Sequence, residues 1–377
     1  MKVSVLQEQL AQGLGIVSRA VSPRSTLPVL ANVLAATDEG RLRLSATNLE
    51  LGITTWIGAK VEVEGSTTIP ARTISDLVGT LPKDRVLMDL EEGTQKLHVS
   101  CGATNTDIKC IDAQEFPPMP APDLSDGIQI NVAALKEMIH QVAFAASSDE
   151  ARPVLTGVLV NVEGNTVTMV AADGFRLSVR KASLSADVPE PFKIIVPARA
   201  LSELARIAGD GNEQVTIMLP RGRSQVVFRM KDVELTSQLI EGTFPDFEQV
   251  IPRSYATRSV VSADALLKAC KQAEIFARES SHIARLDIRP GDGELKPGTI
   301  EVFAQSEETG SNEAIVDASI EGPGMLIAFN VRYLRDVLEV IGTPNVALET
   351  TQAASPGVLR PLGSDDGFLH VIMPMHI

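Results

Sequence analysis

The sequence is poor in aromatic side chains, in cysteine and in long apolar runs. One tryptophan and two tyrosines among 377 residues leave few rings on which exposed bases could stack, so a single-strand nucleic-acid binder is not expected. No apolar run reaches the roughly 18 residues that a membrane span needs, and residues 1–8 turn polar too early for a secretory signal. We therefore expect a cytoplasmic protein with no membrane partner.

Residue types that hold metals are also sparse. The three cysteines, Cys101, Cys110 and Cys270, are spaced by 9 and 160 residues and fit no zinc pattern. An odd number of cysteines without a secretory signal indicates reduced, buried thiols. The five histidines lie far apart, except for His370 and His376. The sequence therefore predicts no metal site and no cofactor.

Motifs that carry catalysis are absent as well. There is no Gly-Lys dipeptide, hence no P-loop, and no Gly-x-Ser-x-Gly nucleophile elbow. Residues 13–15 supply two glycines of a dinucleotide fingerprint without the third. Acidic pairs at 91–92, 307–308 and 365–366 stand beside Gly, Ser or Thr, which is typical of solvated turns. Distant residues can still meet in a fold, so an enzyme stays an alternative hypothesis with little in its favour.

The composition is that of a folded, acidic chain. Hydrophobic residues make up 44% and charged residues 22%, a balance that excludes intrinsic disorder. The length predicts two or three domains. The 34 basic residues stand against 48 acidic ones, a net charge of −14. Spread evenly, this charge would argue against nucleic acid, because phosphate binding depends on Lys and Arg.

Four landmarks recur three times in the same order, and the first is a helix start. Ser4, Asn131 and Ser262 are N-cap-type residues separated by 127 and 131 positions. Apolar residues with spacings of three and four accompany them, as on one face of a helix. They are Val3, Leu6, Leu10, Leu14 and Val17 in the first copy, Leu135, Ile139, Val142 and Ala146 in the second, and Leu266, Cys270, Ala273 and Ala277 in the third.

The second landmark is a strand end that runs into a short helix, at residues 69–72, 196–199 and 329–332. Proline suits the first turn of a helix and asparagine suits a cap. Each helix then repeats one apolar template. The three sets are Ile74, Leu77, Val78 and Leu81; Leu201, Leu204, Ala205 and Ala208; and Leu334, Val337, Leu338 and Ile341.

The other two landmarks are strands. One strand leads into a polar turn at Asn48, Asp173 and Ser306. Another is expected to end near a proline, at residues 115–117, 243–245 and 372–374. Four landmarks at nearly constant offsets predict three copies of about 126 residues each.

Each copy reads as two helices and several short, mostly antiparallel strands, so the fold class is α+β. Strands are expected at 41–44, 165–170 and 225–229. The proline-rich residues 117–122 mark one boundary, and residues 252–254 mark the next. The predicted domains are residues 1–122, 123–253 and 254–377.

The charge divides along the same lines. The six landmark helices with their lead-in residues hold 14 basic and 9 acidic residues, a balance of +5, which leaves −19 for the rest. Basic residues favour helices in any protein, and that alone is one explanation. The repeats suggest a second: equivalent helices can face one way and form one basic surface, with the acidic strands facing away.

At these motifs the chain resembles the bacterial DNA sliding clamps, the beta subunits of the replicative DNA polymerase holoenzyme. The resemblance covers essentially the whole chain, and its most specific pieces are residues 69–72, 171–177, 242–247 and 371–375. It implies a head-to-tail homodimer of three-domain chains that closes a six-domain ring. Helices would line the hole around duplex DNA and antiparallel sheets would form the outer shell, with no base readout.

The resemblance also implies the partners. A non-catalytic ring would tether the replicative DNA polymerase and other proteins that carry a clamp-binding peptide, and thereby confer processivity in chromosomal replication. A separate ATP-driven clamp loader would open it, because this chain has no P-loop. Two alternatives stay open: an enzyme with its active site between repeated domains, and an adaptor with no DNA partner.

Three sets of residues are carried over from the family by position. The DNA-facing set is Arg24, Arg72, Arg152, Arg199 and Arg206. The partner-peptide pocket is Leu155, Ala172, Gly174, Phe175, Arg176, Leu177, Pro245, Val250, Val346, Val371, Met373, Pro374 and Met375. The dimer interface is Thr106 and Ile108 on one side and Ile275 and Phe276 on the other.

This chain departs from some family members at several of these positions. Phe175 stands where some carry histidine, and Gln249 where some carry arginine. Pro153 and Val154 replace an aromatic pair, and Thr106 replaces an apolar residue. A different pocket shape or partner preference, a different DNA contact beside Arg152, and a weaker or wetter dimer interface are therefore expected.

Overall fold

The computed structural model describes residues 1–91, 93–119, 127–188, 190–209, 211, 213–220, 224–279, 281–292, 296–363 and 367–376. The chain divides into two compact units. The first unit comprises Met1–Leu135 and Ala200–Leu239, and the second comprises Lys136–Arg199 and Ile240–Ile377. Because the chain passes from one unit to the other and back, the middle repeat contributes segments to both.

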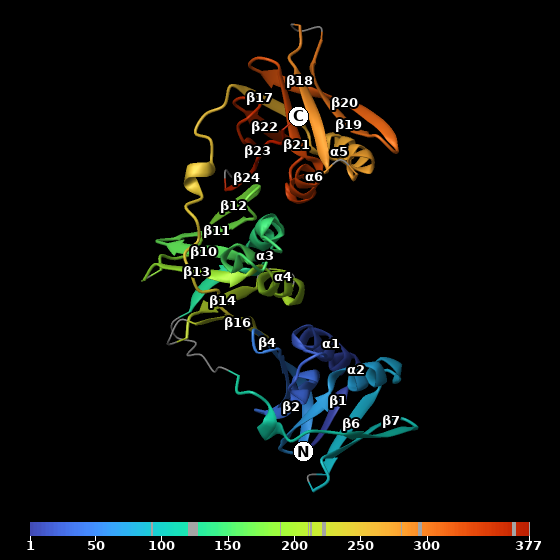
Figure 1. Cartoon of the computed structure of the whole chain (residues 1–377). Helices are drawn as coiled ribbons and strands as arrows, with labels where there is room; N and C mark the ends of the chain where they lie inside the picture. The colour runs from blue at the N-terminus through green and yellow to red at the C-terminus, as the bar shows by residue number, and fades with distance from the viewer. Residues whose placement is uncertain are drawn as a thin grey trace. The chain divides into compact units, whose positions relative to one another are not determined.

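Each unit is built on one large antiparallel sheet, with twelve strands among the described residues (Figure 1). In the first unit the strand order is β8-β7-β6-β1-β4-β16-β15-β14-β9. A branch leaves this sheet at β4, in the pairing order β4-β3-β2-β5. These strands are β1 (Lys2–Leu6), β2 (Asn32–Asp38), β3 (Arg41–Thr47), β4 (Leu51–Val63), β5 (Ser66–Pro70), β6 (Arg85–Glu91), β7 (Lys96–Cys101), β8 (Thr104–Lys109), β9 (Ile128–Asn131), β14 (Gln214–Met218), β15 (Gln225–Arg229) and β16 (Val233–Gln238).

In the second unit the strand order is β13-β10-β11-β12-β24-β23-β22-β17-β20-β19-β18-β21. These strands are β10 (Gly157–Glu163), β11 (Thr166–Ala172), β12 (Arg176–Ser183), β13 (Phe192–Pro197), β17 (Thr257–Ser262), β18 (Ile283–Arg289), β19 (Gly298–Ser306), β20 (Gly310–Glu321), β21 (Met325–Asn330), β22 (Asn345–Thr350), β23 (Gly357–Pro361) and β24 (Phe368–Ile372). The expected strands at 41–44, 165–170 and 225–229 coincide with β3, β11 and β15, apart from Asn165, which lies in the preceding turn.

Six α-helices occur in the described part of the chain, two for each repeat, as the sequence predicts. α1 (Gln7–Val17) packs beside α2 (Ala71–Thr80) in the first unit, and α5 (Ala263–Ala277) packs beside α6 (Val331–Val340) in the second (Figure 1). The helices of the middle repeat are α3 (Val132–Val142) and α4 (Ala198–Ile207). No helix in the described ranges is long and apolar enough to cross a membrane.

The predicted N-caps hold for two of the three repeats. Asn131 Oδ1 accepts a hydrogen bond of 2.9 Å from the Ala133 amide, and Ser262 Oγ accepts one of 3.4 Å from Ala265. The prediction for Ser4 is wrong, because Ser4 lies buried inside β1 and α1 begins only at Gln7. β1 pairs with both β4 and β6, so its backbone is committed to the sheet.

The second helix of each repeat begins where the motif predicts. Pro70 and Pro197 are the last residues of their strands and directly precede α2 and α4, so they stand one position before the helix rather than in its first turn. Asn330 Oδ1 caps α6 by accepting 3.0 Å from the Arg332 amide. The apolar templates are buried against the sheets apart from Leu77 and Ala205, which are half-buried.

The polar-turn landmark is confirmed in all three repeats by one shared hydrogen-bond pattern. The side-chain oxygens of Asn48, Asp173 and Ser306 each accept from the backbone amides two and three residues further on, at 2.7 to 3.2 Å. Such a turn satisfies two amides and redirects the chain. In each repeat it launches the next strand, β4, β12 or β20.

The proline landmark is only partly right, since only the third copy follows a strand, β24. Glu115 ends the 3₁₀ turn η3 (Ala113–Glu115), and residues 243–245 lie outside the strands. What the first two copies share instead is a buried phenylalanine, Phe116 or Phe244, that fixes the connecting segment to a core. The predicted boundary at 122–123 lies outside the described residues, as do Glu92, Asp365 and Asp366 of the acidic pairs. Glu307 and Glu308 lie exposed on a turn, as expected.

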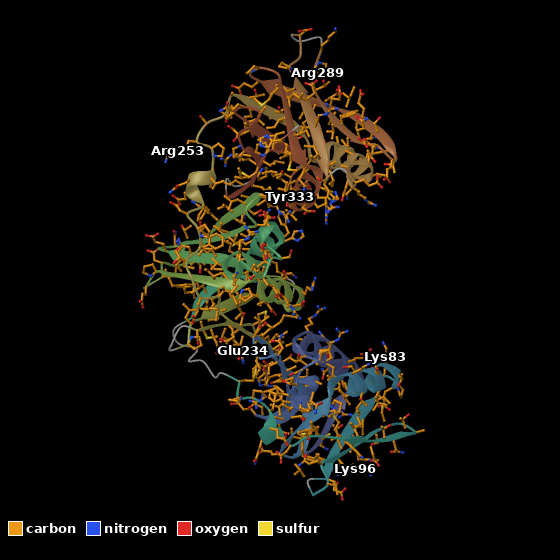
Figure 2. The ribbon with its side chains drawn as sticks, viewed as in Figure 1. Lys83, Lys96, Glu234, Arg253, Arg289 and Tyr333 are labelled. Atoms are coloured by element: carbon orange, nitrogen blue, oxygen red, sulfur yellow. The ribbon has the colours of Figure 1, made fainter. Side chains whose placement is uncertain are left out.

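Successive repeats are joined by strand pairing that recurs at equivalent places. β16 pairs with the start of β4, from Leu51 to Thr55, and β24 pairs with the start of β12, from Arg176 to Arg180. The first joint is reinforced by Trp56, whose ring lies 4.1 Å from the Arg229 guanidinium. Arg229 in turn contacts Glu234 of β16 at 3.0 Å. Glu234 is labelled in Figure 2. Among the described residues, β8 pairs only with β7, and the start of β20 pairs only with β19.

Candidate peptide pocket and charged surface

The second unit contains an apolar hollow of about 150 Å³ where the polar turn at Asp173, the end of β24 and the segment after β16 meet. It is lined by Leu155, Ala172, Gly174, Arg176, Leu177, Phe244, Pro245, Asp246, Phe247, Val250, Val371 and Met373. A buried cluster that includes Leu159, Val170 and Val179 underlies it. The walls are thus anchored in the sheet, and the hollow is suited to apolar side chains.

Local backbone geometry shapes the mouth of the hollow. Gly174 follows the capping residue Asp173 and has a φ of +97°, a conformation that residues with a Cβ rarely adopt. A Cβ at this position would also lie 3.0 Å from the Arg152 Nη1 atom. The glycine therefore permits both the turn and the close approach of Arg152.

Nine of the thirteen residues assigned to the pocket from the sequence line this hollow: Leu155, Ala172, Gly174, Arg176, Leu177, Pro245, Val250, Val371 and Met373. The other four do not line it. Phe175 is 58% exposed on the turn, Pro374 and Met375 follow β24, and Val346 is fully buried in the core of the second unit. Sequence reasoning missed Phe244, Asp246 and Phe247, although all three belong to the quoted motif at 242–247.

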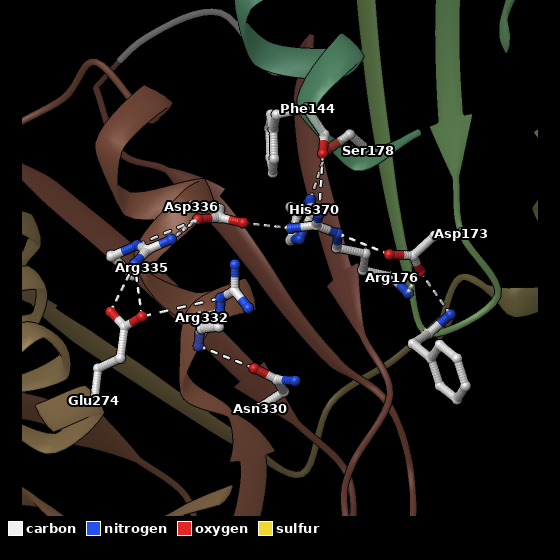
Figure 3. A network of polar contacts seen from close by, with 11 residues as sticks. Phe144, Asp173, Arg176, Ser178, Glu274, Asn330, Arg332, Arg335, Asp336 and His370 are labelled. Carbon is white, nitrogen blue, oxygen red and sulfur yellow. Dashed lines mark hydrogen bonds and ion pairs between the residues drawn. The ribbon is translucent and has the colours of Figure 1, made fainter. Parts of the chain in front are cut away.

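Arg176 forms a rigid wall of the hollow because its donors are committed within the protein. Its guanidinium donates to Asp173 at 3.0 Å, to Asp336 at 2.7 Å and to the Phe144 carbonyl at 2.9 Å (Figure 3). It also stacks 4.4 Å from the ring of Tyr333. An arginine that is only 11% exposed needs this compensation, since an unpaired buried charge is costly.

The same network continues along the helices of the third repeat. Arg335 bridges Asp336 and Glu274, each at 2.7 Å, and thereby joins α6 to α5 (Figure 3). Burial lowers the pKa of Arg335, but its hydrogen bonds and ion pairs with both carboxylates outweigh this and raise it. Glu274 immediately precedes Ile275 and Phe276, two residues assigned to the dimer interface.

His370 lies beneath Arg176 and is fully buried. Its Nδ1 atom forms a hydrogen bond of 2.6 Å with Ser178 Oγ, and its ring stacks on Phe144 at 5.4 Å between centroids (Figure 3). Burial, and then the charge of Arg176, lower its pKa to about 3. The imidazole is therefore neutral at pH 7 and acts as a packed core residue.

The five arginines predicted to face DNA are all exposed, but they fall in both units. Arg24 lies on a turn, Arg72 on α2 and Arg206 on α4, all in the first unit. Arg72 is 94% exposed and lies 3.6 Å from Asp76. In the second unit, Arg152 pairs with Asp149 at 3.2 Å and Arg199 lies at the start of α4.

One acidic residue organises part of this basic group. Glu203 on α4 accepts from Arg206 at 2.7 Å and from Arg19 at 3.0 Å. Arg19 belongs to the 3₁₀ turn η1 (Ser18–Ala20) that follows α1, so this pair ties the first repeat to the second. Arg19 is not one of the five arginines predicted from the sequence to face DNA.

The residues assigned to the dimer interface differ in their solvent exposure. Ile275 is 59% exposed on α5, and Phe276 is half-buried against the core of the second unit. Thr106 is half-buried on β8, whereas Ile108 is already buried within its own unit. On this strand, therefore, the backbone edge and Thr106 are more available for contact than Ile108.

Comparison with known proteins places the chain in a family. Models of the DNA polymerase III beta subunit match its N-terminal domain at residues 1–120, its central domain at 129–246 and its C-terminal domain at 248–376. A beta sliding clamp from Synechococcus elongatus is 35% identical over 380 residues, covering 100% of both chains. The chain therefore belongs to the DNA polymerase III beta subunit family, the beta sliding clamps.

Solved structures agree in fold. The DNA polymerase sliding clamp of Bacillus subtilis superimposes with a TM-score of 0.93 at 28% identity, covering 100% of this chain and 99% of that one. A Pseudomonas aeruginosa sliding clamp bound to griselimycin gives 0.92 at 30% identity, with complete coverage of both. The protein thus consists of three clamp domains and serves DNA polymerase III as a non-catalytic processivity factor.

Proposed function

We propose that two copies of the protein join head to tail into a six-domain ring around duplex DNA. The ring would slide without reading sequence, and would tether the replicative DNA polymerase and other proteins that carry a clamp-binding peptide. We assign the domains to residues 1–122, 123–253 and 254–377. We further propose that the protein works in the bacterial cytoplasm and is opened by a separate ATP-driven clamp loader.

The observation that carries this proposal is the repeated joint between domains. The last strand of one domain, β16 or β24, adds to the strand that follows a polar turn, β4 or β12. Two equivalent edges remain within the described residues, β8 of the first domain and the start of β20 of the third. Because exposed edges pair readily, β8 of one chain fits β20 of the next, and two such joints close a ring.

The repeats also set the register of this joint. Thr104 is the first residue after the hairpin turn that leads into β8, and Val233 is the first residue after the hairpin turn that leads into β16, so the two are equivalent. Val233 pairs with Thr55. The strands that precede the polar turns can be matched by their distance from the turn. The residues that pair with equivalent positions of these strands are Thr55 in the first repeat and Ala314 in the third, so Ala314 is the counterpart of Thr55. Thr104 would then face Ala314 of the partner subunit.

Two residues further along the same pairing, Thr106 would face Asn312 of the partner subunit. The Oδ1 atom of Asn312 is buried and has no hydrogen-bond partner among the described residues. The Thr106 hydroxyl can donate to it, and a buried acceptor left unpaired is unfavourable. This supports a polar contact at Thr106, in line with the wetter interface expected from its replacement of an apolar residue.

Sequence-independent contact with DNA would come from Arg24, Arg72, Arg152, Arg199 and Arg206. Phosphate contacts position a protein without carrying sequence information, and few are needed where the ring itself retains the DNA. Glu203, which pairs with Arg206 and Arg19, limits the net positive charge, and this favours sliding over tight binding.

Partner proteins would insert a short apolar peptide into the hollow lined by Leu177, Val371 and Met373. Its walls are apolar apart from Asp246 and the internally paired Arg176. Met373 is 37% exposed at the end of β24, and a flexible thioether adapts to varied side chains. Phe175, Pro374 and Met375 are proposed to border the bound peptide.

Loading on DNA circles tests the proposal. The protein is incubated with nicked circular DNA, a bacterial clamp loader and ATP, isolated with the DNA by gel filtration, and the circle is then cut once. A sliding ring leaves the ends of the linear DNA. A protein that stays bound after cutting is a direct DNA binder, and one that never loads contradicts the proposed ring.

A further inference from the structure

A second hollow of about 500 Å³ lies in the same unit as the apolar one, and its lining is mainly polar. It is formed by the segment between the 3₁₀ turn η7 (Glu248–Val250) and β17, together with β22 and β23. Its lining residues include Arg253, Tyr255, Glu349 and Arg360. No residue assigned to peptide docking belongs to it.

The two hollows are adjacent at two points. Val371 lines the apolar hollow and pairs across β23 and β24 with Val358, which lines the polar one. Along the connecting segment, Val250 lines the first hollow and Pro252 the second. Ile251 between them packs against the shared buried cluster. A peptide that extends past the apolar hollow on this side would therefore reach the polar one.

The polar hollow carries excess positive charge. Glu349 is shared by Arg360 at 3.0 Å and Arg258 at 3.6 Å, so one carboxylate balances two guanidiniums. Arg253 is exposed on the connecting segment and makes no ion pair among the described residues (Figure 2). Two arginines of the lining, Arg253 and Arg360, thus share the hollow with one carboxylate, which also serves Arg258 outside the lining.

The apolar hollow itself carries acidic groups instead. Asp246 lines it and accepts a hydrogen bond of 2.7 Å from Gln249, with Glu248 exposed beside them. These acidic groups disfavour an acidic residue inside the apolar hollow, while the arginines of the polar hollow attract one. The charges therefore favour one orientation of a peptide that is acidic on one flank.

The segment that carries Arg253 is fixed in place rather than loose. Thr351 Oγ1 donates a hydrogen bond of 3.1 Å to the Ser254 carbonyl, and Ile251 is anchored in the buried cluster. Anchored at both sides, Arg253 loses less freedom on binding than an arginine in a mobile loop.

We propose that this second hollow is an anion subsite that takes Asp or Glu side chains flanking a docked partner peptide. The inference rests on the proposed docking of a peptide in the apolar hollow and adds a specificity determinant to it. Arg253 is the principal contact, with Arg360 in support.

The probe is a hexapeptide selected from a displayed library on the intact protein and kept only if Met373→Asp abolishes its binding. It is then made with three serines on both flanks, with three aspartates at the N-terminal flank, or with three aspartates at the C-terminal flank. Affinities are measured by calorimetry at 50 and 500 mM NaCl. The variants are Arg253→Ser, Arg253→Glu and, as a control of equal charge change on β13, Lys193→Ser.

We expect one acidic version to bind roughly fivefold more tightly than the serine version at low salt, and to lose this gain at high salt. Arg253→Ser should remove most of the gain, Arg253→Glu should reverse it, and Lys193→Ser should keep it. A gain unchanged in Arg253→Glu, or no gain at either flank, overturns the anion subsite while peptide docking stands. A selection that yields no hexapeptide dependent on Met373 overturns peptide docking itself, and the subsite with it.

Discussion

The guanidinium of Arg176 lies 2.7 Å from the carboxylate of Asp336, and this contact joins the strand that borders the apolar hollow to helix α6 of the third repeat. The other donors of Arg176 serve Asp173 and the Phe144 carbonyl. Since the arginine is satisfied internally, recognition in the hollow depends on shape and apolar contact. The pair fixes the orientation of two neighbouring repeats around the site.

Removing the charge of Asp336 should therefore destabilise the second unit. We expect Asp336→Asn to cost about 2 kcal/mol in the free energy of unfolding, below the usual cost of breaking a fully buried pair because Asp336 is partly exposed. Urea unfolding followed by circular dichroism measures this. The control is Asp264→Asn, which breaks the exposed pair with Lys268 and should cost little. Equal losses for both variants would contradict a structural role for the Arg176–Asp336 pair.

Low pH should lower the free energy of unfolding through protonation of His370. Its pKa is lowered to about 3 in the folded state, so the unfolded chain binds a proton that the folded chain does not between about pH 6.5 and 3. The resulting stability is present above this range and is lost as the pH falls through it, by up to about 1.4 kcal/mol per pH unit. His370→Phe, which preserves the stack on Phe144, should flatten this dependence in urea titrations from pH 7 to 4. An unchanged slope would show that His370 does not set it.

The proposed contact between Thr106 and Asn312 makes the dimer dependent on a hydroxyl. Thr106→Val keeps the shape but removes the donor, and should weaken dimerisation by about 1 kcal/mol at each of the two joints. Thr106→Ser keeps the hydroxyl and should dimerise nearly as the parent does. Sedimentation over a concentration series measures both. A Thr106→Val dimer as tight as the parent would exclude the hydrogen bond.

Exposed apolar residues on α5 give a coarser test of the same interface. Ile275→Asp combined with Phe276→Asp would place two carboxylates in it, and monomers are expected by sedimentation. Because Phe276 also packs against the core, Ile275→Asp alone serves as the milder variant. Intact dimers in both variants would count against the assignment of this surface.

Peptide docking should depend on Met373 and not on nearby apolar surface in general. Met373→Asp puts a carboxylate in the wall of the hollow and should weaken peptide binding at least about tenfold while leaving the dimer intact. The matched control is Leu326→Asp, a change of the same kind at an exposed residue of β21 in the same unit. Calorimetry distinguishes them. Equal weakening by the two variants would place the peptide elsewhere.

Local rules made much of the fold predictable from the sequence. Asn48, Asp173 and Ser306 each accept hydrogen bonds from the turn with their own side chain, so a polar residue of this type marks the turn in every repeat. Ser4 misled because its strand pairs on both sides, with residues up to 87 positions away, and such tertiary pairing overrides a local cap signal. Phe116 and Phe244 were taken for strand ends because burial of a linker residue depends on a core that periodicity does not reveal.

The site was less predictable than the fold. Leu155, Leu177 and Val371 come together only because β12 pairs with β24 across about 190 residues, and the family resemblance supplied what spacing could not. The polar hollow around Arg253 has no sequence signature, since its charge excess depends on Glu349 serving two arginines. The open edges of β8 and β20 became apparent only when equivalent strands were compared across all three repeats.

Closing the ring covalently on DNA tests the central proposal most directly. Thr104→Cys with Ala314→Cys should form disulfides across both joints of the dimer, whereas Thr104→Cys with Glu313→Cys, whose side chain points to the opposite face, should not. A dimer loaded on a DNA circle and then oxidised should stay with that circle in detergent and leave it once the DNA is cut. Loss from the uncut circle despite complete cross-linking, or retention after cutting, would contradict a ring that encircles DNA.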